Sequence, residues 1–443
     1  MACRRLLLVS LFALIFNETI VAQPREVGNL IIDGIPDIPA RISERMNQYQ
    51  NVRSAGFLNW NPNAPGMLIA TRFAEVPQIH YVERPGGARR QLTFFKEPVG
   101  NASYYPGQDR KGFLFSMDKG GAEFYQTYYF DLDAGTTTML TDGKARNTGP
   151  LWSHDGKWIA FSSTLRNGVD TDIRVMSIGK PRFSLTNASE EERGKPGASE
   201  ILVEVKGTWG AIDWSVDNSK LLVGQYISAN ESYLYACEVA TKKLTPVNPQ
   251  PNKKIAYGPS LWGKDGKGVY YTSDESGEFQ QLTYLELTSG KKTIITGNIA
   301  WDVDDLAVAD NGRRLAYVTN EDGISKLYVF DLQTNWVDME LPPLPVGLIG
   351  GLEFSKDGNE LGMTLNNAQT SGDAHSINLA TKELVRWTEQ MVKTVRNNGG
   401  KVWYLVGKDE GHGFRKKTNT DYQGYATSLF WEEFLLDGKK GTN

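Results

Sequence analysis

A repeat of about 49 residues constrains the fold of this chain more than any other feature, since Trp60 and Phe354 occupy equivalent points six steps apart. Each copy has an aromatic or apolar residue, then Ser or a substitute, then Asp-Gly or Asn-Gly, and then a hydrophobic run. The clearest copies are residues 151–161, 213–223, 261–271, 308–317 and 353–363. Less regular copies begin at Trp60 and Tyr105, which brings the number of copies to seven.

The residues of the repeat are typical of short antiparallel strands joined by tight turns. Asp-Gly and Asn-Gly supply the positive φ that a hairpin turn needs, and the surrounding aromatic and β-branched residues suit strands. Further strands follow in each copy, and the last ends near a Leu-Thr pair such as Leu92-Thr93 or Leu244-Thr245. One small sheet cannot bury both of its faces, but seven arranged in a ring can. We therefore predict an all-β fold, a seven-bladed β-propeller over residues 55–388.

The N-terminus has the features of a signal peptide over residues 1–22. Arg4 and Arg5 precede an apolar run at residues 6–16, and Ile20-Val21-Ala22 forms a cleavage site. The apolar run is too short to span a bilayer, and no later segment is apolar enough to do so. We expect an exported protein, periplasmic or extracellular, with no membrane contact beyond the signal segment. Residues 23–54 are expected to form an N-terminal strap.

Composition and charge exclude several classes of site. The net charge of -4 provides no basic patch, so we expect no nucleic-acid partner. Once Cys3 leaves with the signal, Cys237 cannot form an internal disulfide, and its strand pattern predicts a buried structural thiol. The histidines lack the spacing of metal ligands, so we expect no metal and no cofactor; they are His80, His154, His375 and His412.

Residues 389–443 have the pattern of the end of an α/β-hydrolase domain. A short apolar run at residues 402–406 is followed by Asp-Glu-Gly-His-Gly-Phe at residues 409–414, and an amphipathic segment begins near Thr418. The histidine of a Ser/Asp/His triad is presented on such a loop, between the last strand and the last helix. His412 is therefore the candidate catalytic residue, in the role of general base.

The sequence provides no catalytic partners for His412. A nucleophile elbow needs Gly-x-Ser-x-Gly between a strand and a helix. The nearest approximations, around Ser199 and Ser260, lack the second glycine at the right spacing. The Ser and Asp partners are thus absent, and we expect the chain to be catalytically incomplete on its own.

With these features the chain resembles exported bacterial members of the prolyl oligopeptidase family of serine peptidases, which carry a propeller ahead of an α/β-hydrolase domain. The markers are the repeats, residues 66–72, residues 91–95 and, most specifically, residues 409–416. The resemblance implies serine-type peptide hydrolysis, with His412 as the general base. The chain departs from the family because its last blade ends at Thr388 and the end of the hydrolase domain follows at once. Residues 389–443 are therefore expected to be a remnant of that domain.

Three functions fit this pattern: a peptidase relative that is inactive alone, an exported propeller that binds or scaffolds a peptide or glycan, or a truncated product without a stable role. A peptide substrate or ligand is the expected partner. The tail also needs support, because one strand at residues 402–406 must be covered and paired. Either a partner chain completes the sheet, or the tail is loosely ordered, or a helix face packs onto the propeller; that face contains Tyr422, Tyr425, Ala426, Leu429 and Phe430.

Overall fold

The computed structural model describes residues 24–50, 53–177, 199–248, 253–334, 336–367, 370–388, 404–407 and 415–432. Within these ranges the chain is mostly β-sheet with few helices, and most sheets are four-stranded and antiparallel. The predicted signal peptide, the junction at Glu389 and the candidate His412 lie outside the described residues.

Five separate sheets have four antiparallel strands each, and neighbouring strands in a sheet are consecutive in sequence. The first two contain β7 (Ser103–Tyr104), β8 (Gly112–Met117), β9 (Gln126–Asp131), β10 (Thr136–Met139), β11 (Asn147–Trp152), β12 (Trp158–Ser163), β13 (Asp172–Ser177) and β14 (Ser199–Val203). The next two contain β15 (Thr208–Trp214), β16 (Lys220–Ser228), β17 (Glu231–Glu238), β18 (Leu244–Pro246), β19 (Tyr257–Trp262), β20 (Gly268–Ser273), β21 (Gln281–Glu286) and β22 (Lys292–Ile294). The fifth contains β23 (Val303–Val308), β24 (Arg314–Glu321), β25 (Ile324–Asp331) and β26 (Val337–Asp338), with a 3-10 turn at Leu332–Thr334.

The sixth sheet has eight strands and joins the two ends of the repeat region. One half contains β3 (Ala55–Trp60), β4 (Met67–Thr71), β5 (Gln78–Val82) and β6 (Arg90–Gln91). The other half contains β27 (Leu348–Phe354), β28 (Glu360–Asn367), β29 (Thr370–Asn378) and β30 (Glu383–Arg386). A single parallel bridge between Asp373 and Ala55 connects the halves, so the last strands of the repeat region lie beside the first.

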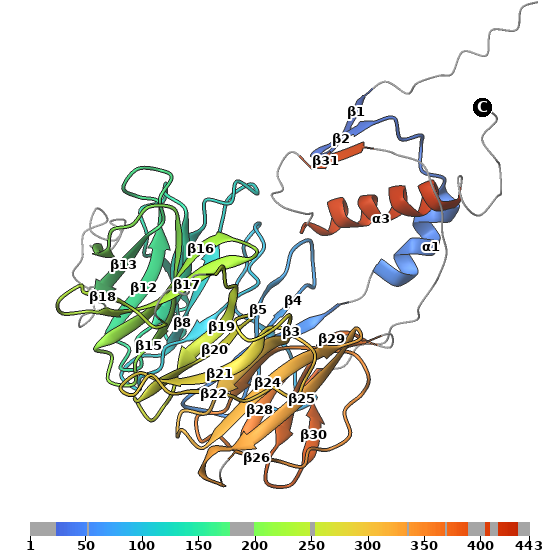
Figure 1. The fold of residues 1–443 in the computed structure, drawn as a ribbon. Coiled ribbons are helices and arrows are strands. Elements are labelled where there is room, and N and C mark those ends of the chain that lie inside the picture. The colour runs from blue at the N-terminus through green and yellow to red at the C-terminus, as the bar shows by residue number, and fades with distance from the viewer. Residues whose placement is uncertain are drawn as a thin grey trace, which may run out of the picture.

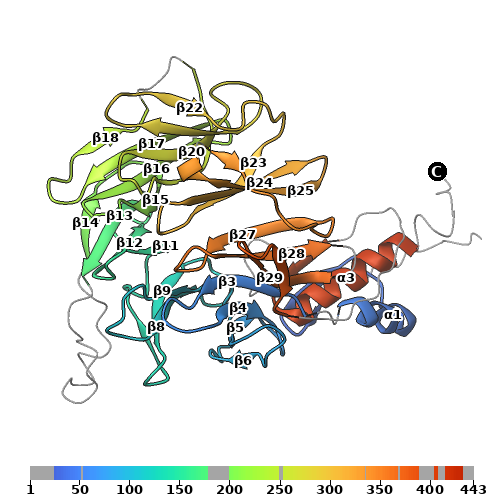
Figure 2. The same cartoon turned by 90° about the horizontal axis from the view of Figure 1, so that it is seen from below.

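The first strands of successive sheets contact one another in chain order. β11 contacts β15, β15 contacts β19, β19 contacts β23, β23 contacts β27, and β27 contacts β3. β3 in turn contacts β7, and β8 contacts β11. Figures 1 and 2 show the sheets set side by side around one centre, which is the arrangement of a β-propeller-like fold.

The turns of the repeat have the backbone conformation that sequence analysis predicts. Gly156, Gly266 and Gly358 have φ values of 68°, 71° and 73°, and Asn218 has a φ of 57°. This left-handed region favours Gly and Asn, which explains the Asp-Gly and Asp-Asn pairs. The predicted turn chemistry is therefore confirmed at these positions.

At Trp152 and Trp214 the repeated aromatic residue ties its sheet to the one before it. The indole Nε1 of Trp152 donates to the carbonyl of Ser103 at 3.2 Å, and that of Trp214 donates to the carbonyl of Leu151 at 3.3 Å. Each indole thus satisfies a backbone acceptor on the neighbouring first strand while burying a large apolar ring.

The residue just before the aromatic can tie its sheet to the next one. Asp213 Oδ2 accepts from the backbone N–H of Trp262 at 2.8 Å. Glu353 closes the ring in the same way, since its carboxylate accepts from the backbone N–H of Trp60 at 3.1 Å and from Asn59 Nδ2 at 2.5 Å. Burial raises the pKa of Glu353 to about 8, against these two donors.

A threonine hydroxyl closes the end of several sheets, and at Thr93 and Thr141 it belongs to a Leu-Thr pair. Its Oγ1 accepts from a backbone N–H fourteen residues earlier, over 2.9 to 3.0 Å. The pairs are Ile79 with Thr93, Thr127 with Thr141, Leu282 with Thr296, and Ala374 with Thr388.

The described segments nearest the two termini form a small terminal unit at one side of the ring (Figures 1 and 2). Its strands are β1 (Arg25–Val27), β2 (Leu30–Asp33) and β31 (Tyr404–Gly407), and its helices are α1 (Ala40–Gln50) and α3 (Lys417–Trp431). β31 pairs antiparallel with β2, and α1 contacts α3. The neighbour of the C-terminal strand therefore comes from the residues expected to form the strap, an arrangement that sequence analysis does not foresee.

The apolar face of α3 packs on the N-terminal segment. Ala426 lies in one buried cluster with Leu30, Ile32 and Ile35, and Tyr422 packs against that cluster. Leu429 is only 2% exposed. Packing of this face onto the propeller, one of the three open alternatives, therefore does not describe Ala426, because the N-terminal strands provide its apolar cover.

Candidate functional site

The described segments on either side of the predicted general base, His412, lie beside one cavity. His412 itself lies outside the described residues, within 408–414. Before it, β31 ends at Gly407, which pairs with Leu30. After it, the described chain resumes at Arg415, and Lys416 is the residue before α3. Leu30 and Lys416 both line the same cavity.

This cavity has a volume of about 860 Å³ and lies between the terminal unit and the β3–β6 half of the eight-stranded sheet. Ligand pockets in proteins typically measure about 300–1,000 Å³, so it has the size of a binding site. Its walls come from the β1–β2 turn, the β4–β5 loop, the segment after β6 and the start of α3. The lining residues are Val27, Gly28, Asn29, Leu30, Phe73, Ala74, Glu75, Val76, Gln78, Gln91, Phe94, Phe95, Lys96, Lys416, Thr418, Asn419 and Tyr422.

Glu75, in the β4–β5 loop, fixes the wall formed by α3. The backbone N–H of Lys417 donates to the Glu75 carbonyl at 2.8 Å, and the backbone N–H of Thr418 donates to Glu75 Oε1 at 2.8 Å. The Thr418 hydroxyl donates to the same oxygen at 2.5 Å. Lys416, at the N-cap, makes no side-chain cap, so a propeller carboxylate caps the helix and offsets its positive end. Sequence analysis missed Glu75 because this contact joins distant segments.

The cavity exposes aromatic rings to solvent. Phe94 is 75% exposed and Phe73 is 44% exposed, while Phe95 packs against Phe115 with ring centroids 5.6 Å apart. The guanidinium carbon of Arg53 lies over the Phe73 ring, 5.0 Å from its centroid. Exposed aromatic surface gains free energy when a ligand covers it, so these rings can contribute to binding.

Lys96, Lys416 and Glu75 are the charged residues among those that line the cavity. Lys416 Nζ lies 3.7 Å from Glu97 Oε2, while Glu97 Oε1 accepts from the backbone N–H of Gly120 at 3.1 Å. Burial raises the pKa of the Tyr422 hydroxyl, which accepts from Arg25 Nη2 at 3.4 Å. The charged lining groups carry a net charge of one positive unit when ionised.

Exposed apolar side chains gather on the same face of the ring. We define the loop face as the surface formed by the loops that join the second and third strands of a sheet and by the loops between sheets. Residues 72–77, 118–125 and 164–171 are three such loops. The large apolar residues exposed on this face include Phe73, Phe94, Phe124, Leu165, Val169, Tyr226, Ile227, Trp301, Ile324, Val346 and Leu348. A concentration of this kind marks an interaction surface.

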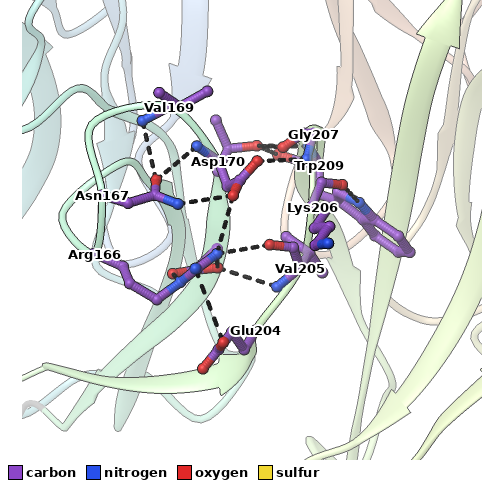
Figure 3. A network of polar contacts seen from close by, with 11 residues as sticks. Arg166, Asn167, Val169, Asp170, Glu204, Val205, Lys206, Gly207 and Trp209 are labelled. Atoms are coloured by element: carbon purple, nitrogen blue, oxygen red, sulfur yellow. Dashed lines mark hydrogen bonds and ion pairs between the residues drawn. The ribbon is translucent and has the colours of Figure 1, made fainter.

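Polar contacts hold at least one of these loops in a defined shape (Figure 3). Arg166 Nε donates to Asp172 Oδ2 at 2.8 Å, and Arg166 Nη2 donates to the Val205 carbonyl at 2.7 Å. Asp170 Oδ1 accepts from the backbone N–H of Gly207 at 2.8 Å. The exposed Val169 is therefore carried on a preorganised loop.

The three histidines that the structure describes lie within hydrogen-bonding distance of backbone carbonyls. A ring nitrogen of each lies 2.9 to 3.0 Å from a backbone carbonyl, and these pairs are His80 with Gln78, His154 with Trp214, and His375 with Asp373. Burial lowers the pKa of His80 and of His375. The repeat serines are turn residues, since the Ser153 hydroxyl donates to Asp155 Oδ1 at 2.7 Å. In the described part of the chain, the structure brings none of these histidines to a serine hydroxyl.

The remaining sequence predictions for sites concern sulfur and metals. Cys237 in β17 is fully buried, and burial raises the pKa of its thiol to about 11, as expected for a structural cysteine. Over the described ranges, no group of His, Cys, Asp and Glu side chains could hold a metal ion. Neither α1 nor α3, the α-helices that the structure describes, is long and apolar enough to cross a membrane.

No protein-family model matches the chain. Among curated proteins, it is 25% identical over 225 residues to an uncharacterized peptidase of Bacillus subtilis, YuxL, which covers 50% of this chain and 29% of that protein. It is 34% identical over 77 residues to dipeptidyl-peptidase 5 of Porphyromonas endodontalis, covering 17% of this chain and 11% of that protein. It is also 34% identical over 111 residues to an uncharacterized protein of Agrobacterium fabrum, covering 25% and 36% of the two chains.

Two solved peptidases share the fold. A prolyl endopeptidase has a TM-score of 0.60 at 15% identity and covers 80% of this chain and 52% of its own. A puromycin-hydrolyzing peptidase of Mycobacterium tuberculosis has a TM-score of 0.60 at 15% identity, with coverages of 82% and 56%. The chain thus spans about half of these solved peptidases and about a third or less of the curated relatives. Together the similarities support a relationship to peptidases.

Proposed function

We propose that this chain is an exported, seven-bladed propeller of the prolyl oligopeptidase type that binds peptides on its loop face and does not cleave them by itself. In this proposal residues 55–388 form the seven blades and residues 389–443 are the remnant of a hydrolase domain. His412 is the general base that lacks a nucleophile and an acid.

The cavity of about 860 Å³ is the observation that carries the proposal. It combines exposed aromatic rings with polar groups, as sites that orient a ligand do. It also opens beside the described ends of the His412 segment and lies next to the apolar loop face. An extended peptide can therefore place side chains in the cavity and continue across the neighbouring loops.

We expect binding without cleavage because a catalytic imidazole works only with partner groups. Acyl transfer requires a nucleophile within hydrogen-bond reach of the histidine and a carboxylate that fixes the ring tautomer. The 443 residues contain no Gly-x-Ser-x-Gly motif that would aim a serine. The similarity to peptidases supports peptide as the class of ligand. Peptidase activity itself is not part of the proposed function.

The test measures binding and hydrolysis in one sample. A mixture of fluorescein-labelled octapeptides is titrated with the protein, polarisation is recorded, and the peptides are then analysed by mass spectrometry. We expect saturable binding, intact peptides and no labelling of any serine by a fluorophosphonate probe. Absence of binding would contradict the proposal, as would cleavage products. Hydrolysis that appears only when a second protein is added would instead favour completion of the sheet by a partner chain.

Two variants locate the binding site. Ala74→Trp fills the cavity from an exposed loop position and is expected to abolish most of the polarisation signal. Ala122→Trp places the same ring on the corresponding loop of the next sheet, outside the cavity lining, and serves as the matched control. Equal binding by both variants would place the peptide elsewhere.

A further inference from the structure

The chemistry of the cavity narrows the class of peptide that the proposed function would bind. Its most exposed lining groups are aromatic, with Phe94 75% and Phe73 44% exposed. Val27, another lining residue, is 47% exposed. A planar ring that packs on these side chains would cover exposed apolar surface.

Positive charge accompanies the aromatic rings. Lys96 follows Phe95 directly, lines the cavity and is exposed, while Lys416, at the start of α3, lines the cavity and lies 3.7 Å from Glu97 Oε2. Arg53 lies over the Phe73 ring. Ammonium groups at the rim of an apolar pocket favour a carboxylate on the ligand.

The anionic lining group is already engaged by the protein. Glu75 Oε1 accepts from both the backbone N–H and the hydroxyl of Thr418, so this carboxylate holds α3 in place. It keeps its negative charge, and Glu97 already pairs with Lys416, so Lys96 is the lysine that a ligand carboxylate would contact.

We propose that the cavity recognises an aromatic side chain with a carboxylate beside it. This inference rests on the proposed peptide-binding function and specifies its ligand. The carboxylate can come from an acidic residue next to the aromatic one inside a peptide, or from the free C-terminus of a peptide that ends in an aromatic residue. Both sources present the same pair of groups to Phe94 and Lys96.

The experiment uses defined fluorescein-labelled pentapeptides and the full chain, with binding measured by fluorescence polarisation. The reference peptide is Gly-Gly-Phe-Glu-Gly-amide. In two comparison peptides Ala replaces Phe or Lys replaces Glu. A further pair ends in Phe, one with a free carboxylate and the other amidated. We expect Phe to Ala to weaken binding about tenfold, as loss of an interface anchor does, and Glu to Lys to weaken it about threefold at low salt.

Protein variants assign these effects to the cavity. Phe94→Ala should remove the preference for Phe over Ala, and Lys96→Glu should reverse the preference for Glu over Lys. Lys119→Glu, an exposed lysine outside the cavity lining, should change neither. The two peptides that end in Phe identify the carboxylate source. A site for a terminal carboxylate binds the peptide with the free acid and does not bind the amidated one.

The outcomes separate the two proposals. If all peptides bind with equal affinity, the function stands and the assigned specificity is wrong. If none binds, the peptide-binding function itself fails. Preferences that persist unchanged in Phe94→Ala and Lys96→Glu would also overturn the assignment, because the recognising groups would lie outside the cavity.

Discussion

Glu353→Gln should change how stability depends on pH, because Glu353 in β27 links one half of the eight-stranded sheet to β3 in the other half. Its carboxylate accepts from Asn59 and from the backbone of Trp60, yet burial raises its pKa from 4.5 to about 8. A group whose folded-state pKa is raised stabilises the fold fully below its unfolded pKa. That contribution is lost as pH rises from about 4.5 to about 8, since only the unfolded state ionises freely in this range.

The size of the effect follows from the pKa change and the exposure of the side chain. A rise from 4.5 to about 8 corresponds to about 5 kcal/mol, at about 1.4 kcal/mol per pKa unit. The residue is only half-buried, so water screens part of this free energy. We expect about 2 kcal/mol of stability to be lost between about pH 5 and about pH 9.

Urea unfolding followed by circular dichroism at these two pH values measures the difference. Gln does not titrate, but its NH2 group replaces one of the two accepting oxygens and loses a hydrogen bond worth about 1 kcal/mol at every pH. Relative to the original chain, Glu353→Gln should therefore gain about 2 kcal/mol of stability between about pH 5 and about pH 9. Glu383→Gln, at an exposed position of β30, is the matched control and should follow the original chain at both values. Parallel pH dependences for the original chain and Glu353→Gln would refute the reasoning, since other titrating groups are common to both.

Three further predictions test the fold. Leu429→Ala should cost the terminal unit about 3 kcal/mol and speed hydrogen exchange in α3, because Leu429 is 2% exposed; an unchanged exchange rate would contradict the packing. Thr296→Val should lower the free energy of unfolding by about 1–2 kcal/mol, since the Leu282 N–H loses its buried acceptor, whereas Thr293→Val on the exposed side should not. A chain shortened to residues 53–388 should unfold cooperatively with a β-rich spectrum, and a gradual melt would argue that the ring needs the terminal unit.

The local structure of the repeat could be predicted from sequence because one pattern recurs. Asp-Gly and Asp-Asn pairs require a positive φ, and Gly156 and Asn218 adopt it. An acid or amide before the repeated aromatic was also visible in the sequence, as at Asp213 and Glu353. Its role was missed, since a polar residue on a first strand resembles an exposed position until the neighbouring sheet is known.

The terminal unit and the cavity could not be predicted from local patterns. β2 pairs with β31 across most of the chain, and such a contact leaves no periodic signal. Phe73 and Phe94 look like core residues in the sequence, but the loops that carry them leave them exposed. The catalytic assignment of His412 remains a prediction, because the described residues stop on either side of it.

Photo-crosslinking tests the central claim, peptide binding without cleavage, most directly. The pentapeptide Gly-Gly-Phe-Glu-Gly-amide, with Phe replaced by benzoylphenylalanine, is irradiated with the full chain, and the adducts are mapped by mass spectrometry. The account predicts crosslinks to cavity residues such as Phe73, Phe94 and Tyr422, an intact peptide and no acylated serine. Crosslinks confined to surfaces away from the loop face, or an acyl-serine adduct with a shortened peptide, would contradict it.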